Sequence, residues 1–347
     1  MIDINKLKNW QAPEDWIEIQ TIDAHTCGEP LRIIISGFPD LIGKSLLEKR
    51  AYAKINFDQL RKAIMWEPRG HADMYGALIT EPDTPGADFG VIFIHNEGYS
   101  TGCGHAVIAL TKMFLETGLI KKTEPITEVK MDVPSGYIRA FAEIRHGKIK
   151  SIGFDNVPSF VEHLDSVIDV PGLGNIKYDL AFGGAYYAFV EVEQIGLDCT
   201  QDYHNELIEK GVLIKETISK SVSLNHPTEP EMNFLYGTIF TGLPKDLNNH
   251  SRNVCVFANG EVDRSPTGTG VSARAAIHYK RGEIDIGDSI TIESIIGSIF
   301  SVKINNITNF GKYEAVIPEV RGTAYLIGKN SFWINSKDPL KDGFILR

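Results

Sequence analysis

The stretch Ser100-Thr-Gly-Cys-Gly-His-Ala-Val-Ile-Ala-Leu110 decides how we interpret the fold. Two glycines flank Cys103 directly before an apolar run, which predicts an apolar helix that begins beside the cysteine. A second stretch, Asp263-Arg-Ser-Pro-Thr-Gly-Thr-Gly-Val-Ser-Ala273, has the same form, with Thr267 in the place of Cys103. In both stretches a glycine follows 15 positions after that residue, as is typical of a helix C-cap.

Landmarks on either side of the two helix starts repeat in the same order. A Tyr-Gly pair begins at Tyr75, 28 residues before Cys103, and another begins at Tyr236, 31 residues before Thr267. A further glycine follows the two helix starts at 33 and 30 positions. We interpret this pattern as a duplication, although chance similarity among short strand patterns would produce the same signal.

The predicted fold is α/β (α+β), with two pseudo-symmetric halves that meet near residue 150. Residues 1–150 would form the half with Cys103, and residues 151–320 the half with Thr267. The last segment, about 320–347, is expected to pack back onto the first half. The predicted helices are Lys44–Lys54, Phe57–Met65, His105–Glu116, Gln201–Lys210 and Val271–Lys280.

Composition excludes several classes of protein. The 347 residues include 35 Lys and Arg and 45 Asp and Glu, a formal net charge of −10, which argues against a nucleic-acid partner. Four cysteines without a CxxC pair do not make a disulfide scaffold, so reduced thiols in a cytoplasmic protein are expected. No apolar stretch approaches the roughly 18–20 residues that span a bilayer. We expect a small-molecule partner and no membrane partner, and a homodimer stays open.

Cys103 lies where exposed backbone N–H groups and the positive end of a helix dipole would meet. That environment lowers the pKa of a thiol, and the same N–H groups can hold a carboxylate. His105 would lie beside the thiol. The alternative is a buried structural cysteine at the start of a helix.

The second helix start carries Thr267, which is expected to cap the helix with its side chain. The capping role alone is the simpler alternative, and the stretch lacks the lysine of a phosphate-binding P-loop. If the two starts face each other, their dipoles converge on one anion. Cys103 would then remove a Cα proton from an amino acid, and Asp263 would bind the substrate nitrogen.

Other polar residues have simpler interpretations. His25, Cys27 and Glu29 alternate as strand neighbours and suggest metal ligands, but they provide too few, and a Gly-Glu-Pro turn explains them equally well. Cys199 and Cys255 lie in or beside apolar strands and are predicted to belong to the core.

The sequence resembles the proline racemase family, which includes 4-hydroxyproline epimerases and trans-3-hydroxy-L-proline dehydratases. The resemblance covers nearly the whole chain, through the stretches Asp23–Arg32, Gly70–Pro82, Asn96–His105, Tyr236–Gly242 and Asp263–Ala276. It implies a diaminopimelate epimerase-like fold, in which each half is a curved, mostly antiparallel sheet around a central helix. It also implies an active site between the halves, with no metal and no organic cofactor.

The chain departs from the racemases at one position. They carry a cysteine at both helix starts, and here Thr267 replaces the second. A hydroxyl is too weak an acid to reprotonate a carbanion, so the Cys/Thr pair resembles the trans-3-hydroxy-L-proline dehydratases. The resemblance implies Cys103 and Thr267 as catalytic residues. The implied substrate-binding residues are Gly104, His105, Asp263, Gly268 and Thr269.

The expected reaction is therefore dehydration of trans-3-hydroxy-L-proline to Δ1-pyrroline-2-carboxylate without a cofactor. The alternatives are a proline racemase or 4-hydroxyproline 2-epimerase, and a catalytically silent amino-acid-binding protein. The epimerases also place a histidine near the stretch Tyr236–Thr238, and this chain has none there.

Overall fold

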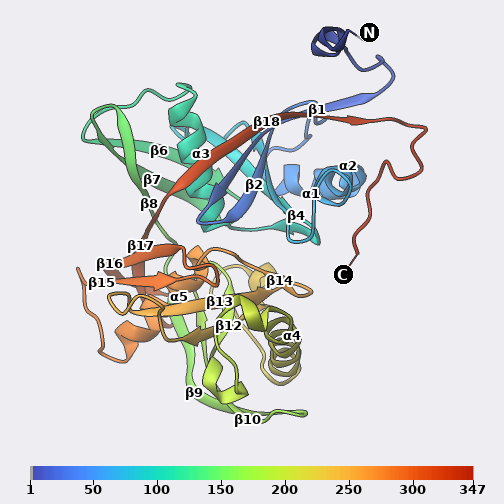
Figure 1. Ribbon diagram of the computed structural model, residues 1–347. Coiled ribbons are helices and arrows are strands. Elements are labelled where there is room, and N and C mark those ends of the chain that lie inside the picture. Colours follow the sequence, from blue (N-terminus) through green and yellow to red (C-terminus); the bar gives the residue numbers. More distant parts are fainter. Residues whose placement is uncertain (1–2, 347) are drawn as a thin grey trace.

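The computed structural model describes residues 3–346, which form two lobes, each with a curved sheet around one helix (Figure 1). The central helix is α3 (Gly104–Glu116) in the upper lobe and α5 (Gly268–Lys280) in the lower lobe. The two sheets are continuous with each other through the antiparallel pair of β8 (Lys148–Asp155) and β17 (Tyr313–Gly322). The predicted architecture of two α/β halves is confirmed.

The other strands of the upper lobe are β1 (Ile17–Thr26), β2 (Glu29–Ser36), β3 (Tyr75–Thr80), β4 (Phe89–His95), β5 (Gly98–Ser100), β6 (Ile126–Val133), β7 (Gly136–Arg145) and β18 (Ala324–Ile334). Those of the lower lobe are β9 (Phe160–Val170), β10 (Gly174–Phe182), β11 (Tyr186–Glu191), β12 (Leu235–Gly242), β13 (Ser251–Phe257), β14 (Glu261–Val262), β15 (Ser289–Glu293) and β16 (Ile299–Phe310). The last strand, β18, runs antiparallel along β1, as Figure 1 shows at the top of the molecule.

Strand pairing is the same in the two lobes. In the upper lobe β3 runs parallel to β2 and antiparallel to β4, and β4 runs parallel to β6. In the lower lobe β12 has the same relation to β11 and β13, and β13 runs parallel to β15. The two Tyr-Gly landmarks lie at the starts of equivalent strands, β3 and β12. The duplication inferred from sequence therefore corresponds to a repeated topology.

The remaining helices lie on the outside of the lobes and are α1 (Leu46–Asn56), α2 (Asp58–Met65) and α4 (His204–Ser221), with short 3-10 turns at Ile4–Asn9, Val192–Ile195, Gln201–Tyr203 and Pro230–Met232. The predicted end of α4 at Lys210 was wrong. Gly211 packs against Val256 of β13, and Ile214 and Ile218 continue the buried face, so the helix runs on to Ser221.

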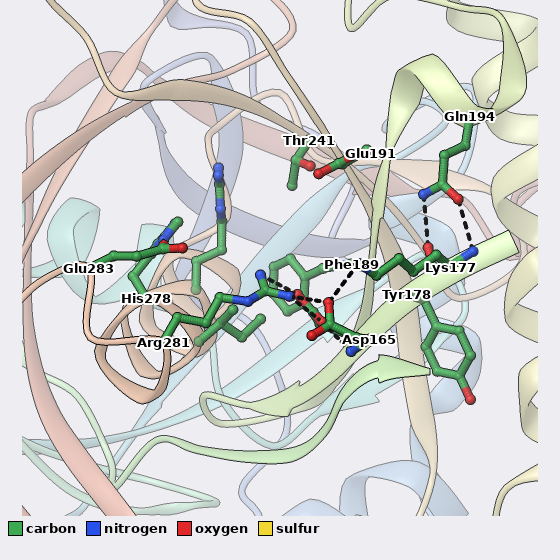
Figure 2. A pocket seen from close by; sticks show the side chains of 13 residues that line it. Asp165, Lys177, Tyr178, Phe189, Glu191, Gln194, Thr241, His278, Arg281 and Glu283 are labelled. Atoms are coloured by element: carbon green, nitrogen blue, oxygen red, sulfur yellow. Dashed lines mark hydrogen bonds and ion pairs between the residues drawn. The ribbon is translucent and has the colours of Figure 1, made fainter. Parts of the chain in front are cut away.

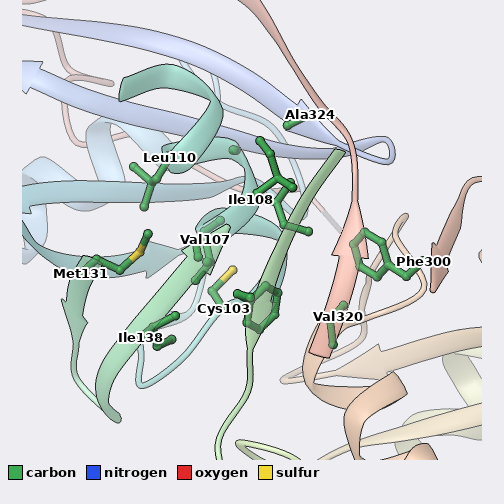
Figure 3. Packing of buried hydrophobic residues seen from close by; sticks show 14 of the residues in the cluster. Cys103, Val107, Ile108, Leu110, Met131, Ile138, Phe300, Val320 and Ala324 are labelled. Atoms are coloured by element: carbon green, nitrogen blue, oxygen red, sulfur yellow. The ribbon is translucent and has the colours of Figure 1, made fainter. Parts of the chain in front are cut away.

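The core around α3 is apolar on every side of the helix. Figure 3 shows Val107, Ile108 and Leu110 of α3 packed among strand residues, with Cys103 at the edge of the same cluster. Phe300 joins this cluster from the lower lobe. The start of α3 is therefore a desolvated place at the junction of the lobes.

No helix in the described part of the chain is long and apolar enough to cross a membrane. Within residues 3–346 no group of three or more His, Cys, Asp or Glu side chains is arranged to hold a metal ion.

Candidate functional site

The two helix starts meet at Gly104 and Gly268. A Cβ atom built on Gly104 would lie 3.0 Å from the Cα of Gly268, and the reverse distance is also 3.0 Å. The same atom on Gly104 would lie 2.9 Å from Cζ of Phe154. The backbones touch, so only glycine fits at these two positions. Two helix N-termini with free backbone N–H groups thus converge on one point, which suits an anion such as a carboxylate.

Cys103 is buried at the N-cap position of α3, with its Sγ 3.2 Å from Nδ1 of His105. Burial raises the pKa of the thiol well above its ordinary value. A hydrogen bond from the backbone of Ala106 acts in the opposite direction, and the charge of Asp263 raises the pKa further. The helix start was expected to lower this pKa, but in this chain desolvation is the larger effect.

His105 is the nearest proton acceptor for that thiol. Burial lowers the pKa of its imidazole to about 3, so the ring is neutral at physiological pH. The ring also hydrogen-bonds to the backbone of Pro30, and the ring of Tyr75 packs edge-on with centroids 4.9 Å apart. A neutral imidazole at this distance can accept a hydrogen bond from the thiol and so fix the position of the sulfur.

Thr267 occupies the N-cap position of α5, but the predicted side-chain cap was wrong. Its φ of +69° turns the hydroxyl away from the first turn, and the side chain makes no capping hydrogen bond. The Oγ1 atom is buried and forms no hydrogen bond of ordinary geometry among the described residues, although its hydroxyl is close enough to Asp263 and Cys255 to lower the pKa of each. A β-branched residue in a left-handed conformation is strained, which points to a site rather than to a helix cap.

Asp263 lies buried between the two helix starts. Its Oδ1 accepts a hydrogen bond from Ser265 N at 2.7 Å, and no ion pair to it is formed within residues 3–346. Burial raises the pKa of its carboxyl group, and the hydrogen bond from Ser265 opposes that change. A buried carboxylate without a cationic partner is costly, and a bound ammonium group would neutralise it.

Thr269 lines a small cavity between the lobes. Its Oγ1 is 2.7 Å from the hydroxyl oxygen of Tyr187, and the cavity encloses about 80 Å³. Gly102, His95 and Tyr236 line the same cavity. Cys103 follows Gly102 directly, and Thr267 lies two residues before Thr269, so both helix starts are adjacent to this space. Of the seven residues predicted for the site, Thr269 lines this cavity, and the other six lie at or shortly before the two helix starts.

A larger cavity of about 210 Å³ lies elsewhere, in the lower lobe near the C-terminal end of α5 (Figure 2). Its rim carries paired charges, since Arg281 bonds both Asp165 and Asp179. None of the predicted site residues lines it.

Several residues near the site were not identified from the sequence, or were given another interpretation there. Cys27 forms the turn between β1 and β2 with φ of +52°, which agrees with the turn interpretation of that segment. Glu29 accepts a hydrogen bond from the backbone N–H of Arg264 at 2.7 Å, and so ties the two lobes together. Tyr187 carried no sequence signal.

The two remaining cysteines are both buried, as predicted. Cys199 belongs to the core of the lower lobe. Cys255 is also close to the site: burial raises its pKa well above the ordinary value, and the charge of Asp263 adds to this. Its proximity follows from β13, which runs just before the site segment that carries Asp263.

Known proteins resemble the chain along its whole length. The family model described as Proline racemase matches residues 21–345. A trans-3-hydroxy-L-proline dehydratase of Colwellia psychrerythraea is 49% identical over 99% of this chain and 97% of its own. A trans-L-3-hydroxyproline dehydratase of Xenopus tropicalis is 44% identical, covering 96% of this chain and 97% of its own. A 3-hydroxyproline 2-epimerase of Burkholderia multivorans is 43% identical, covering 95% and 98%.

A solved structure shares the fold. The crystal structure of a hydroxyproline epimerase from Agrobacterium vitis, with bound trans-4-OH-L-proline, superposes with a TM-score of 0.89. It is 32% identical and covers 96% of both chains. By the family match and these full-length relatives, the chain belongs to the proline racemase family.

Proposed function

We propose that this protein is a hydro-lyase that converts trans-3-hydroxy-L-proline to Δ1-pyrroline-2-carboxylate. The observation that carries the proposal is the pair of opposed helix starts, one with the thiol of Cys103 and the other with the hydroxyl of Thr267. Full-length relatives named as dehydratases support the same reaction.

In the proposed mechanism, the free backbone N–H groups at Gly104, Gly268 and Thr269 hold the substrate carboxylate, and Asp263 binds the ring nitrogen. Cys103, beside the neutral imidazole of His105, acts as a thiolate and removes the proton from Cα. The helix starts stabilise the negative charge that develops on the carboxylate in the transition state. The C3–O bond then breaks, a Cα–C3 double bond forms, and the enamine tautomerises to the imine.

The rival function is a two-base epimerase, because one relative is named a 3-hydroxyproline 2-epimerase. Epimerisation requires an acid on the face of Cα opposite Cys103. A threonine hydroxyl stays protonated throughout the working pH range and is too weak an acid to quench a carbanion. We therefore favour dehydration.

The test is incubation of the protein with trans-3-hydroxy-L-proline, L-proline and trans-4-hydroxy-L-proline, followed by chiral chromatography. We expect pyrroline-2-carboxylate from the first substrate and no inverted product from the other two. Epimers without any pyrroline-2-carboxylate would assign the rival function, and binding of all three without turnover would indicate a silent binding protein.

The proposal also covers the domain boundaries, the location and the oligomeric state of the protein. We propose that the halves divide near residues 150 and 320, that the protein works in the cytoplasm, and that it forms a homodimer. The chemistry proposed uses only side chains and backbone groups of this chain. Size-exclusion chromatography with light scattering tests the oligomeric state.

A further inference from the structure

His95 and Glu261 form a buried pair across the junction of the lobes. His95 ends β4 of the upper lobe and Glu261 begins β14 of the lower lobe. Nδ1 of His95 lies 3.6 Å from Oε2 of Glu261, and both side chains are buried. His95 also lines the cavity next to the helix starts, so this pair faces the space where substrate is proposed to bind.

The two nitrogens of the His95 ring have different surroundings. Nδ1 lies 3.3 Å from the backbone N of Glu97 and 3.6 Å from Oε2 of Glu261, so that in protonated His95 it can donate to this carboxylate. The ring of Tyr75 stacks on the ring of His95 with centroids 5.5 Å apart, and this contact fixes the orientation of the imidazole. Nε2 has no hydrogen-bond partner among the described residues, and it is the nitrogen left to face the cavity.

The stereochemistry of the proposed substrate shows from which side the leaving oxygen needs its proton. In trans-3-hydroxy-L-proline the hydroxyl and the carboxylate lie on opposite faces of the ring. The Cα–H bond also lies opposite the carboxylate, so this hydrogen and the hydroxyl share one face. Cys103 removes that hydrogen, and the hydroxyl therefore leaves toward the lobe of Cys103 and away from Thr267.

Among the possible proton donors on that side, His105 already makes other contacts through both ring nitrogens. Its imidazole is neutral, with its pKa lowered by burial to about 3, and its nitrogens face Cys103 and the backbone of Pro30. Cys103 becomes a thiol when it takes the Cα proton, but burial raises the pKa of this thiol well above its ordinary value, so it is a weak acid toward the departing oxygen. His95 and Tyr99 of the upper lobe also line the cavity, and burial raises the pKa of Tyr99 to about 12, so that His95 is the better proton donor of the two.

We infer that His95, positioned by Glu261, donates the proton that turns the departing 3-hydroxyl into water. The inference rests on the proposed dehydration. In the step, the Cα–H pair of electrons becomes the Cα–C3 double bond, and the C3–O bond breaks. The oxygen takes the Nε2 proton of protonated His95 and leaves as water. Cys103 ends the step as a thiol and His95 as a neutral imidazole, and proton exchange with solvent restores both.

The variant His95→Gln tests this role with three reactions. A general acid contributes about 10²- to 10⁴-fold, so dehydration of trans-3-hydroxy-L-proline should fall by that factor. Elimination of chloride from trans-3-chloro-L-proline needs no protonated leaving group and should stay within about threefold of wild type. Exchange of the Cα proton of L-proline in deuterated water, which needs only Cys103, should also persist.

Glu261→Gln should also slow the elimination of water relative to the elimination of chloride. The effect should be smaller than in His95→Gln, because Glu261 only positions the histidine. His204→Gln, an exposed residue on α4, is the matched control and should leave all three reactions unchanged. Circular dichroism confirms the fold of each variant. If His95→Gln fails to fold, the ratio in Glu261→Gln decides.

An unchanged rate of dehydration in a folded His95→Gln would overturn the inference. An equal loss of all three reactions would also overturn it, because that pattern means a structural role. Failure of the proposed function looks different, since wild type itself would then release no water from trans-3-hydroxy-L-proline while still exchanging the Cα proton.

Discussion

Replacing Thr267 by cysteine tests why this chain should dehydrate rather than racemise. The structure indicates that the change is tolerated. Thr267 holds φ of +69°, a conformation that costs a β-branched residue roughly 1–2 kcal/mol, and its Oγ1 makes no hydrogen bond of ordinary geometry among the described residues. The exchange removes one methyl group and no cap. We therefore expect the free energy of unfolding of Thr267→Cys to stay within about 1 kcal/mol of wild type.

The functional consequence is a proton donor on the second face of Cα. A thiol has a pKa near ~8.5, so it can give a proton to a carbanion where a threonine hydroxyl cannot. Burial next to Asp263 would raise the pKa of the new thiol, as it does for Cys103 and Cys255. Thr267→Cys should therefore form D-proline from L-proline, whereas wild type should form none.

The assay is chiral chromatography of L-proline incubations, with thermal unfolding of each variant in parallel. Thr267→Ser is the control, because it keeps a hydroxyl and should not gain racemisation. In deuterated water, wild type should exchange the Cα proton with retention, since Cys103 returns deuterium to the face it came from. Wild-type racemisation of L-proline at a rate comparable with dehydration would refute the one-base mechanism.

Four further predictions concern separate parts of the structure. Gly268→Ala places a Cβ 3.0 Å from the Cα of Gly104 and should force the helix starts apart, lowering kcat/KM by about 10²-fold in steady-state assays; normal kinetics would show that the starts do not form the site. Because burial raises the pKa of Cys103, inactivation by iodoacetamide should keep accelerating as pH rises above neutrality, and a plateau below pH 7 would contradict this. Asp263→Asn should fold normally but lose most of kcat/KM, since only the carboxylate offers charge to the ring nitrogen; near-normal kinetics would leave Asp263 a purely structural role. Hydrogen bonds from the Asn249 side chain, from the backbone N–H groups of Lys245 and Asp246, and from Arg252 lower the pKa of Glu293 from 4.5 to about 2. The carboxylate therefore stabilises the fold above pH 4.5, and this contribution is lost as pH falls through 2. Glu293→Gln should thus cost at most about 3 kcal/mol in urea unfolding at neutral pH, less where solvent screens the pair, and nothing near pH 2.

The central helices and the site motifs were predictable because their signals are local. Glycines around Cys103 and beside Thr267, followed by apolar runs, predict both helix starts without any knowledge of tertiary contacts. The break between α1 and α2 was likewise placed near Asn56, where α1 ends.

Long strands with exposed polar residues were harder to predict. The strands β9, β10 and β17 give a weak sequence signal, because charged residues on their solvent faces interrupt the hydrophobic pattern. In β18 the alternation of buried and exposed positions is lost, since Tyr325 and Ile327 are apolar and exposed. Their pairing is also distant in sequence: Ile17 of β1 lies opposite Ile334 of β18. These segments find their hydrogen-bond partners only in the folded sheet, so their own sequence does not identify them as strands.

Residues that enter the site from afar could not be assigned from sequence for the same reason. Glu29 meets Arg264 across 235 positions, and Tyr187 reaches Thr269 across 82. Tyr187 stands in no motif that indicates chemistry, and the segment of Glu29 suggested only a metal site or a turn. Cys255 was correctly predicted as buried, and its place beside Asp263 depends on how β13 returns to the site.

Because the two lobes repeat one topology, the difference between their helix starts is informative. In the proposed mechanism both starts bind the substrate carboxylate through backbone N–H groups, which do not depend on whether the adjacent side chain is a thiol or a hydroxyl. Replacing a second thiol by Thr267 therefore leaves carboxylate binding intact and removes only the proton source on one face. The backbone has diverged as well, since φ is −157° at Cys103 and +69° at Thr267. A carbanion formed in this site has two outcomes, return of the proton from Cys103 or loss of a group from C3. The first regenerates substrate, so a 3-hydroxyl next to a proton donor makes elimination the one productive reaction.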